Sequence, residues 1–119
     1  MAKILVVDDN EKNISLVRTR LVFHEHEVVG ATSGEEGIKK AREEKPDLIL
    51  MDLQMSGMDG LSAMNIIKAD PATRAIKVIC ITSYAEGDRD LVLEVGFDDY
   101  ISKPIDTRAL PGIVRKHTG

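Results

Sequence analysis

The sequence is poor in cysteine and in aromatic residues. It has one cysteine, Cys80, no tryptophan, two phenylalanines and two tyrosines. A single cysteine excludes an internal disulfide, and we therefore expect a reducing, cytoplasmic setting. The scarcity of aromatic rings argues against a protein that stacks on exposed bases.

Long apolar runs and basic blocks are also missing. No apolar stretch approaches the roughly 18–20 residues that a membrane-spanning helix needs. The apolar run within residues 1–10, MAKILVVDDN, is too short for a signal peptide. The net charge of −4 argues against nonspecific nucleic-acid binding. We therefore expect neither membrane insertion nor direct contact with nucleic acid.

What the sequence does contain is a regular alternation of two patterns. Short apolar runs, mostly β-branched, predict strands at 3–8, 27–31, 47–52, 77–82 and 98–102. Helical signals follow them at 11–23, 33–44, 59–70, 87–95 and, more weakly, 107–117. Three of the strand runs are apolar without alternation, as in a sheet covered on both faces. The pattern predicts one α/β domain, residues 1–119, built on a doubly wound, five-stranded parallel sheet.

Several residues predict where helices begin and end. Ser33 and Glu36 form a capping-box pattern, and Asp59 can cap the next helix. Gly96 suits the end of the fourth helix. Pro111 and Gly112 disfavour a helix interior, so the last helix is expected to begin late and to be short or frayed.

Reactive side chains stand at the ends of four predicted strands. The first strand ends in Asp8 and Asp9, the third in Asp52, the fourth in Thr82 and the fifth in Lys103. Ligands bind outside the carboxyl ends of strands in open α/β sheets. We therefore expect these three carboxylates, one hydroxyl and one ammonium to converge at one edge.

Three neighbouring carboxylates repel one another, and one lysine does not neutralise them. A hard divalent cation resolves this repulsion, and Mg²⁺ fits a site with few protein ligands. Such a site suits phosphoryl transfer, with a carboxylate as the nucleophile. Taken singly, each residue has a plainer interpretation: Asp8 and Asp9 could start a helix, Thr82 could end a strand, and Lys103 could be solvated.

The combination resembles a known family. The segments that carry the likeness span the whole chain: ILVVDDN, PDLILMDLQM, GMDG and DDYISKPID. In order and spacing they are similar to the receiver domain of bacterial two-component response regulators, and most of all to single-domain receivers of the CheY and DivK type. The resemblance implies a (βα)5, flavodoxin-like sheet with the strand order 2-1-3-4-5.

The resemblance also implies a role for each site residue. Asp52 would be the phosphoacceptor. Asp9 and Asp52 would bind Mg²⁺, for which Mn²⁺ can substitute, together with the backbone carbonyl of Gln54, while Asp8 would act mainly through metal-bound water. Lys103 would pair with the phosphoryl group. The apolar run before Asp52 predicts a buried strand that carries Asp52 to the edge of the sheet, and we expect Asp52 to be partly exposed there.

Further implied roles concern switching. The Thr82 hydroxyl would turn toward the phosphoryl group, Tyr100 would be the switch aromatic, and the bond before Pro104 would be cis. The phosphoryl donor would be a histidine kinase or a histidine phosphotransferase. The output would be a protein that binds the surface of the fourth helix, fifth strand and fifth helix, with the receiver as a monomer or a phosphorylation-dependent dimer.

The chain departs from the family pattern in two places. Ser56 stands where receivers usually have proline, so the loop after Asp52 is expected to be more mobile. The stretch from Thr82 to Gly96 is about one residue shorter than in CheY-like chains. Elsewhere, plain structural roles are expected: a turn for residues 24–26, solvation for Asp98 and Asp99, and an inert core thiol for Cys80.

Several functions remain open from the sequence. The first is a signalling switch that is no enzyme beyond its own phosphorylation and dephosphorylation, either standing alone or excised from a larger response regulator or hybrid kinase. The second is a Mg²⁺-dependent aspartyl-phosphate phosphatase, although Gln54 stands where such enzymes need a second acid. The third is a nucleotide or flavin binder, although no glycine-rich loop follows the first strand.

Overall fold

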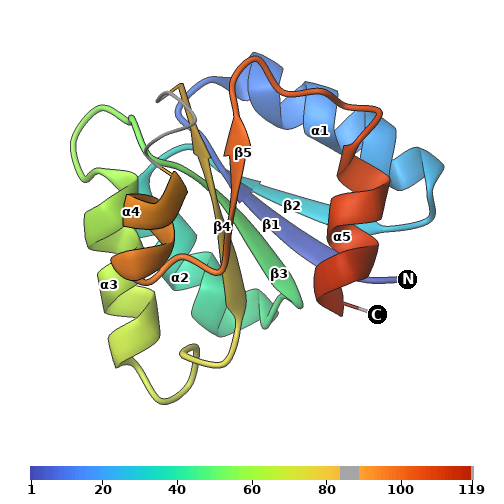
Figure 1. Cartoon of the computed structure of the whole chain (residues 1–119). Helices are drawn as coiled ribbons and strands as arrows, with labels where there is room; N and C mark the ends of the chain where they lie inside the picture. The colour runs from blue at the N-terminus through green and yellow to red at the C-terminus, as the bar shows by residue number, and fades with distance from the viewer. Residues whose placement is uncertain (84–88, 119) are drawn as a thin grey trace.

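The computed structural model describes residues 1–83 and 89–118, and strands alternate with helices through them (Figure 1). The elements are β1 (Lys3–Val7), α1 (Glu11–Phe23), β2 (Glu27–Ala31), α2 (Gly34–Glu44), β3 (Leu48–Asp52), α3 (Gly60–Ala69), β4 (Lys77–Thr82), α4 (Arg89–Glu94), β5 (Asp99–Ser102) and α5 (Leu110–Thr118). The predicted strands are confirmed to within a residue at each end.

All neighbouring strands pair in parallel, in the order β2-β1-β3-β4-β5. The predicted α/β fold and its strand order are therefore confirmed. Helices α1 and α5 cover one face of the sheet, and α2, α3 and α4 cover the other (Figure 1). The register pairs Val7 with Met51, and Asp52 with Ile81. The carboxyl ends of these central strands therefore lie at one edge, where the sequence had placed the candidate site.

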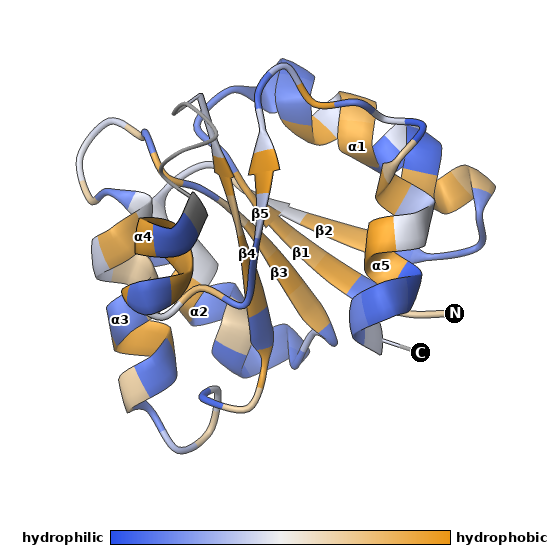
Figure 2. Cartoon of the chain, viewed as in Figure 1, coloured by the Kyte–Doolittle hydropathy of each residue, from blue (hydrophilic) through white to orange (hydrophobic). Residues whose placement is uncertain are grey.

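Two apolar clusters hold the layers together. The strands β1, β3 and β4 are hydrophobic apart from a charged residue at one end of each (Figure 2), as expected for strands whose two faces are both covered. Alternate residues of each strand face opposite layers. Ile79 and Ile81 therefore join the cluster under α1 and α5, whereas Val78 and Cys80 join the cluster under α2, α3 and α4.

The helix ends follow the predicted capping signals. The Ser33 hydroxyl accepts a hydrogen bond from the Glu36 N–H, and Asp59 accepts one from the Ser62 N–H. The Glu36 carboxylate reaches back to the Thr32 N–H, one residue before the position expected for a capping box.

The structure describes the predicted ends of α4 and α5 to different extents. Pro111 lies in the first turn of α5, where its missing N–H costs little, and the helix continues to Thr118. Gly96 follows α4 with a φ of +126°. The predicted start of α4 at Gly87 lies outside the described residues, as do residues 84–88 of the shortened stretch between Thr82 and Gly96. Among the described helices, none is long and apolar enough to cross a membrane.

Candidate functional site

Three carboxylates meet at the carboxyl edge of the sheet. Asp8 and Asp9 follow β1, and Asp52 ends β3. One oxygen atom from each carboxylate lies within 4.8 Å of the other two. The predicted convergence of these side chains is therefore present in the structure.

Asp52 is buried, with 1% of its surface exposed. Its Oδ1 accepts hydrogen bonds from Lys103 Nζ and from the Gln54 N–H, both at 3.0 Å. The prediction of partial exposure is wrong, because β3 is covered on both faces as far as its last residue. An unpaired charge could not persist there. The Lys103 ammonium and the loop amide supply the partners that burial requires.

Asp8 is also buried, and two donors orient it. Its Oδ1 accepts from the Asn10 N–H at 2.9 Å, and its Oδ2 accepts from Asn13 Nδ2 at 3.0 Å. Burial raises the pKa of Asp8, and the nearby charge of Asp52 adds to the rise, while these hydrogen bonds oppose it. Asn13 is a site residue that sequence reasoning missed, although it lies in the first turn of the helix that follows the acids.

Asp9 is exposed and touches the loop after β3. Its Oδ2 accepts a hydrogen bond from the backbone N–H of Ser56 at 3.0 Å. The predicted mobility of this loop remains a prediction. The contact itself could not be foreseen, because it joins residues that are 47 positions apart through a backbone group.

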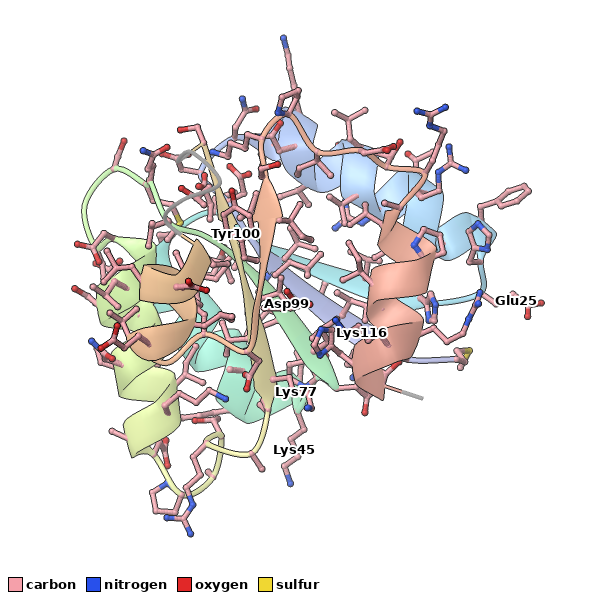
Figure 3. All side chains as sticks on the ribbon, in the orientation of Figure 1. Glu25, Lys45, Lys77, Asp99, Tyr100 and Lys116 are labelled. Atoms are coloured by element: carbon pink, nitrogen blue, oxygen red, sulfur yellow. The ribbon has the colours of Figure 1, made fainter. Side chains whose placement is uncertain are left out.

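Thr82 and Tyr100 occupy neighbouring strands. Thr82 ends β4 and is fully buried, and its backbone carbonyl accepts from the Lys103 N–H at 2.8 Å. Tyr100 lies on β5 (Figure 3) and is half-buried. It packs against the cluster under α2, α3 and α4. The peptide bond between Lys103 and Pro104 is cis, as predicted. Lys103 thus follows β5 directly and reaches Asp52 across the end of β4.

A side-chain hydrogen bond joins two loops at the same edge. The Ser83 hydroxyl donates to Gln54 Oε1 at 2.9 Å, and both side chains are exposed. The backbone of Gln54 binds Asp52 through its N–H, as described above. Gln54 therefore connects the loop after β3 with the loop after β4.

The donor set fits a divalent cation. The three converging groups offer only oxygen atoms, the ligands that Mg²⁺ prefers. Lys103 neutralises part of their charge through Asp52, but two further carboxylates remain within 4.8 Å. A cation held between them would relieve the repulsion. The residues present are therefore suited to bind Mg²⁺ or a similar hard ion.

The predicted solvation of Asp98 and Asp99 needs correction. Asp98 is exposed, but its Oδ2 accepts from the Val78 N–H and from Lys68 Nζ. Asp99 is largely covered: its Oδ2 lies 2.7 Å from His117 Nε2 and 3.6 Å from Lys116 Nζ (Figure 3). The sequence pattern could not show that α5 folds back onto β5 at this point.

The predicted core position of Cys80 and the predicted turn at residues 24–26 are confirmed. Cys80 is fully buried in β4, and burial raises the pKa of its thiol to about 12. Residues 24–26 form the turn between α1 and β2, where His26 Nδ1 accepts from the Ala2 N–H.

Comparison with known proteins points to one family. The family model described as "Response regulator receiver domain" matches residues 4–115. The protein PilH of Pseudomonas aeruginosa is 39% identical over 92% of this chain and 92% of its own length. The polar-differentiation response regulator DivK of Brucella ovis is 36% identical over 98% of this chain and 95% of its own.

Other relatives are longer, or resemble the chain mainly in structure. The response regulator PleD of Caulobacter vibrioides is 42% identical over 98% of this chain, which spans only 26% of PleD. The chemotaxis response regulator CheY4 of Vibrio cholerae superposes with a TM-score of 0.89 over 98% of both chains, and at 24% identity this likeness shows the fold. The receiver domain of sensor histidine kinase PA1611 from Pseudomonas aeruginosa, solved with a magnesium ion in its active-site cleft, is 31% identical over 99% of this chain and 98% of its own, with a TM-score of 0.88.

Proposed function

The chain belongs to the response regulator receiver family, and from that premise we propose that it is a phosphorylation-dependent switch of a two-component system. Receiver domains are signalling domains rather than conventional enzymes. The observation that carries the proposal is the buried Asp52, paired with Lys103 at 3.0 Å beside two further carboxylates. We propose that residues 1–119 form one receiver unit, alone or within a longer protein.

Asp52 would act as the nucleophile. A carboxylate oxygen forms a bond to phosphorus while the bond between phosphorus and the donor's imidazole nitrogen breaks. The electron pair of that bond stays on the nitrogen, and because the other ring nitrogen of the donor carries a proton, the imidazole leaves as the neutral base. Lys103 and the Gln54 N–H hold Oδ1 and thereby orient the carboxylate. When bound, Mg²⁺ would offset the charge of the phosphoryl oxygens. Asp9, Asp52 and the Gln54 carbonyl would hold the ion, with Asp8 acting through bound water.

Phosphorylation would replace one negative charge with nearly two at a buried position. Lys103 would turn to the phosphoryl group, and the Thr82 hydroxyl would approach it. Tyr100 would then swing inward and repack, which changes the surface of α4, β5 and α5. A histidine kinase or phosphotransferase would supply the phosphoryl group, and a downstream protein would read this surface.

Mass spectrometry tests the proposal. Incubation with Mg²⁺ and acetyl phosphate should add the mass of one phosphoryl group to the intact protein. Asp52→Asn should abolish the gain. Asp59→Asn is the matched control, because asparagine keeps the helix cap in the same loop, and it should accept the group. No gain in the wild type, or a gain retained in Asp52→Asn, would refute the proposal.

A phosphatase that acts on external esters fits the site less well. Such an enzyme needs an acid to protonate the leaving group. The residue two positions after Asp52 is Gln54, whose amide accepts from Ser83 and cannot donate a titratable proton. Turnover of a simple phosphate ester by the wild type, lost in Asp52→Asn, would favour the phosphatase instead.

A further inference from the structure

The backbone amide of Ser56 lies against the most exposed member of the carboxylate cluster. Asp8 and Asp52 are buried, and two donors hold each of them. Asp9 is exposed, and its side chain makes one hydrogen bond among residues 1–83 and 89–118, from the Ser56 N–H at 3.0 Å. We propose that this amide positions Asp9 for the cation, so that the N–H at position 56 sets the affinity of the site for Mg²⁺. The inference rests on the proposed function.

The physical reason is preorganisation. An exposed aspartate samples several rotamers, and fixing one of them costs conformational entropy when a metal binds. A donor that already holds the carboxylate reduces this cost. The bond uses one of about four lone-pair sites on the carboxylate, which leaves the others available to a cation. The partial positive charge of the N–H also opposes the repulsion from Asp8 and Asp52.

The bond depends on the backbone rather than on the side chain. The Ser56 side chain is exposed, and the donor is the main-chain nitrogen. Any residue except proline supplies this donor. Gly57 follows with a φ of +77°, a conformation that glycine adopts without strain, and it turns the loop next to the contact. The choice of a residue other than proline at position 56 therefore decides whether Asp9 has this partner.

The test compares chains that differ in this amide. Ser56→Ala keeps the N–H and is the reference. Ser56→Pro removes the N–H, and an ester linkage at position 56, introduced as lactic acid, removes it without the proline ring. By isothermal titration with MgCl₂, both amide-free chains should bind Mg²⁺ about three- to tenfold more weakly than Ser56→Ala. The free energies of unfolding of these two chains in EDTA, compared with that of Ser56→Ala, show whether removal of the amide weakens only Mg²⁺ binding.

A second measurement examines the contact without metal. In EDTA, the Ser56 amide of the wild type should exchange with deuterium more slowly than that of Asp9→Ala, as followed by NMR. Equal exchange in the two proteins overturns the inference. So does Mg²⁺ affinity that is the same, or higher, in the amide-free chains, and both results leave the proposed function standing. A wild type that binds no Mg²⁺ overturns the metal site itself and the inference with it.

Discussion

Gly60 packs against the backbone of Asp52, the proposed phosphoacceptor, and its replacement by alanine should lower the stability of the fold and disturb the candidate site. Gly60 is the buried first residue of α3. A Cβ added there would lie 2.3 Å from the Asp52 carbonyl oxygen, 2.8 Å from Leu53 Cα and 2.9 Å from the Asp52 carbonyl carbon. All three neighbours are backbone atoms. The chain would have to move apart by roughly 1 Å to reach an ordinary contact distance of about 3.5 Å.

The free-energy cost of Gly60→Ala depends on the backbone atoms that must move. Overpacking costs about 1–3 kcal/mol, and sometimes more, whereas alanine gains up to about 1 kcal/mol over glycine within a helix. Asp52 ends a strand that is buried on both faces, and Leu53 follows it directly, so the backbone at this point can move little. We expect Gly60→Ala to lower the free energy of unfolding by about 2–3 kcal/mol. Because the displaced atoms include those of Asp52, the folded variant should also accept a phosphoryl group more slowly.

Urea unfolding followed by far-ultraviolet circular dichroism measures the first effect, since the chain has no tryptophan to report on. Gly112→Ala is the matched control. Gly112 lies in α5, and a Cβ there meets no heavy atom within 4 Å. Alanine should therefore stabilise that helix by about 0.5–1 kcal/mol. A Gly60→Ala variant within about 0.5 kcal/mol of the wild type would refute the steric argument.

Three further predictions concern other groups. Asn13→Ala removes a donor to buried Asp8 and should lower the free energy of unfolding by about 1–3 kcal/mol, measured in urea, with an unchanged value as the contrary result. Burial raises the pKa of Asp99, but bonds from His117 and the Tyr100 N–H and the charge of Lys116 together lower it below 3.8. The difference in the free energy of unfolding between the wild type and Asp99→Asn should therefore have its full value above about pH 4, and should vanish as the pH falls through the lowered pKa. A difference that does not depend on pH would contradict this. Cys80, with its pKa raised to about 12, should react with iodoacetamide at pH 8 far more slowly in the folded protein than in urea, and equal rates would show the thiol to be accessible.

The strands were predictable because each carries a local signal. Runs of β-branched residues set their positions, and the rule that parallel strands end at one edge placed Asp8, Asp9 and Asp52 together. The burial of Asp52 was not predictable in the same way. It depends on how far the covering layers extend, and on an ammonium that is 51 residues away.

The wrong prediction for Asp99 and the unforeseen contact between Ser56 and Asp9 also depend on residues that are distant in the sequence. Asp99 is paired because α5 packs beside β5, and Ser56 reaches Asp9 because of the path of a loop. A sequence pattern reports on neighbours within a few residues, whereas these contacts join residues 18 and 47 positions apart. Ser56 was singled out as a departure from the family, but only the structure shows that its amide donates a hydrogen bond to Asp9.

The division of the interior into two clusters gives the domain independent parts that can be altered separately. Val17 packs in the cluster under α1 and α5, and Ile67 packs in the cluster under α2, α3 and α4. The sheet lies between them, so substitutions on opposite sides share no packing partner, and their effects on stability should add. Tyr100 packs against the cluster under α2, α3 and α4. Residues of α1 such as Val17 could therefore be repacked for stability while α4 and Tyr100, on the opposite side of the sheet, keep their native packing partners.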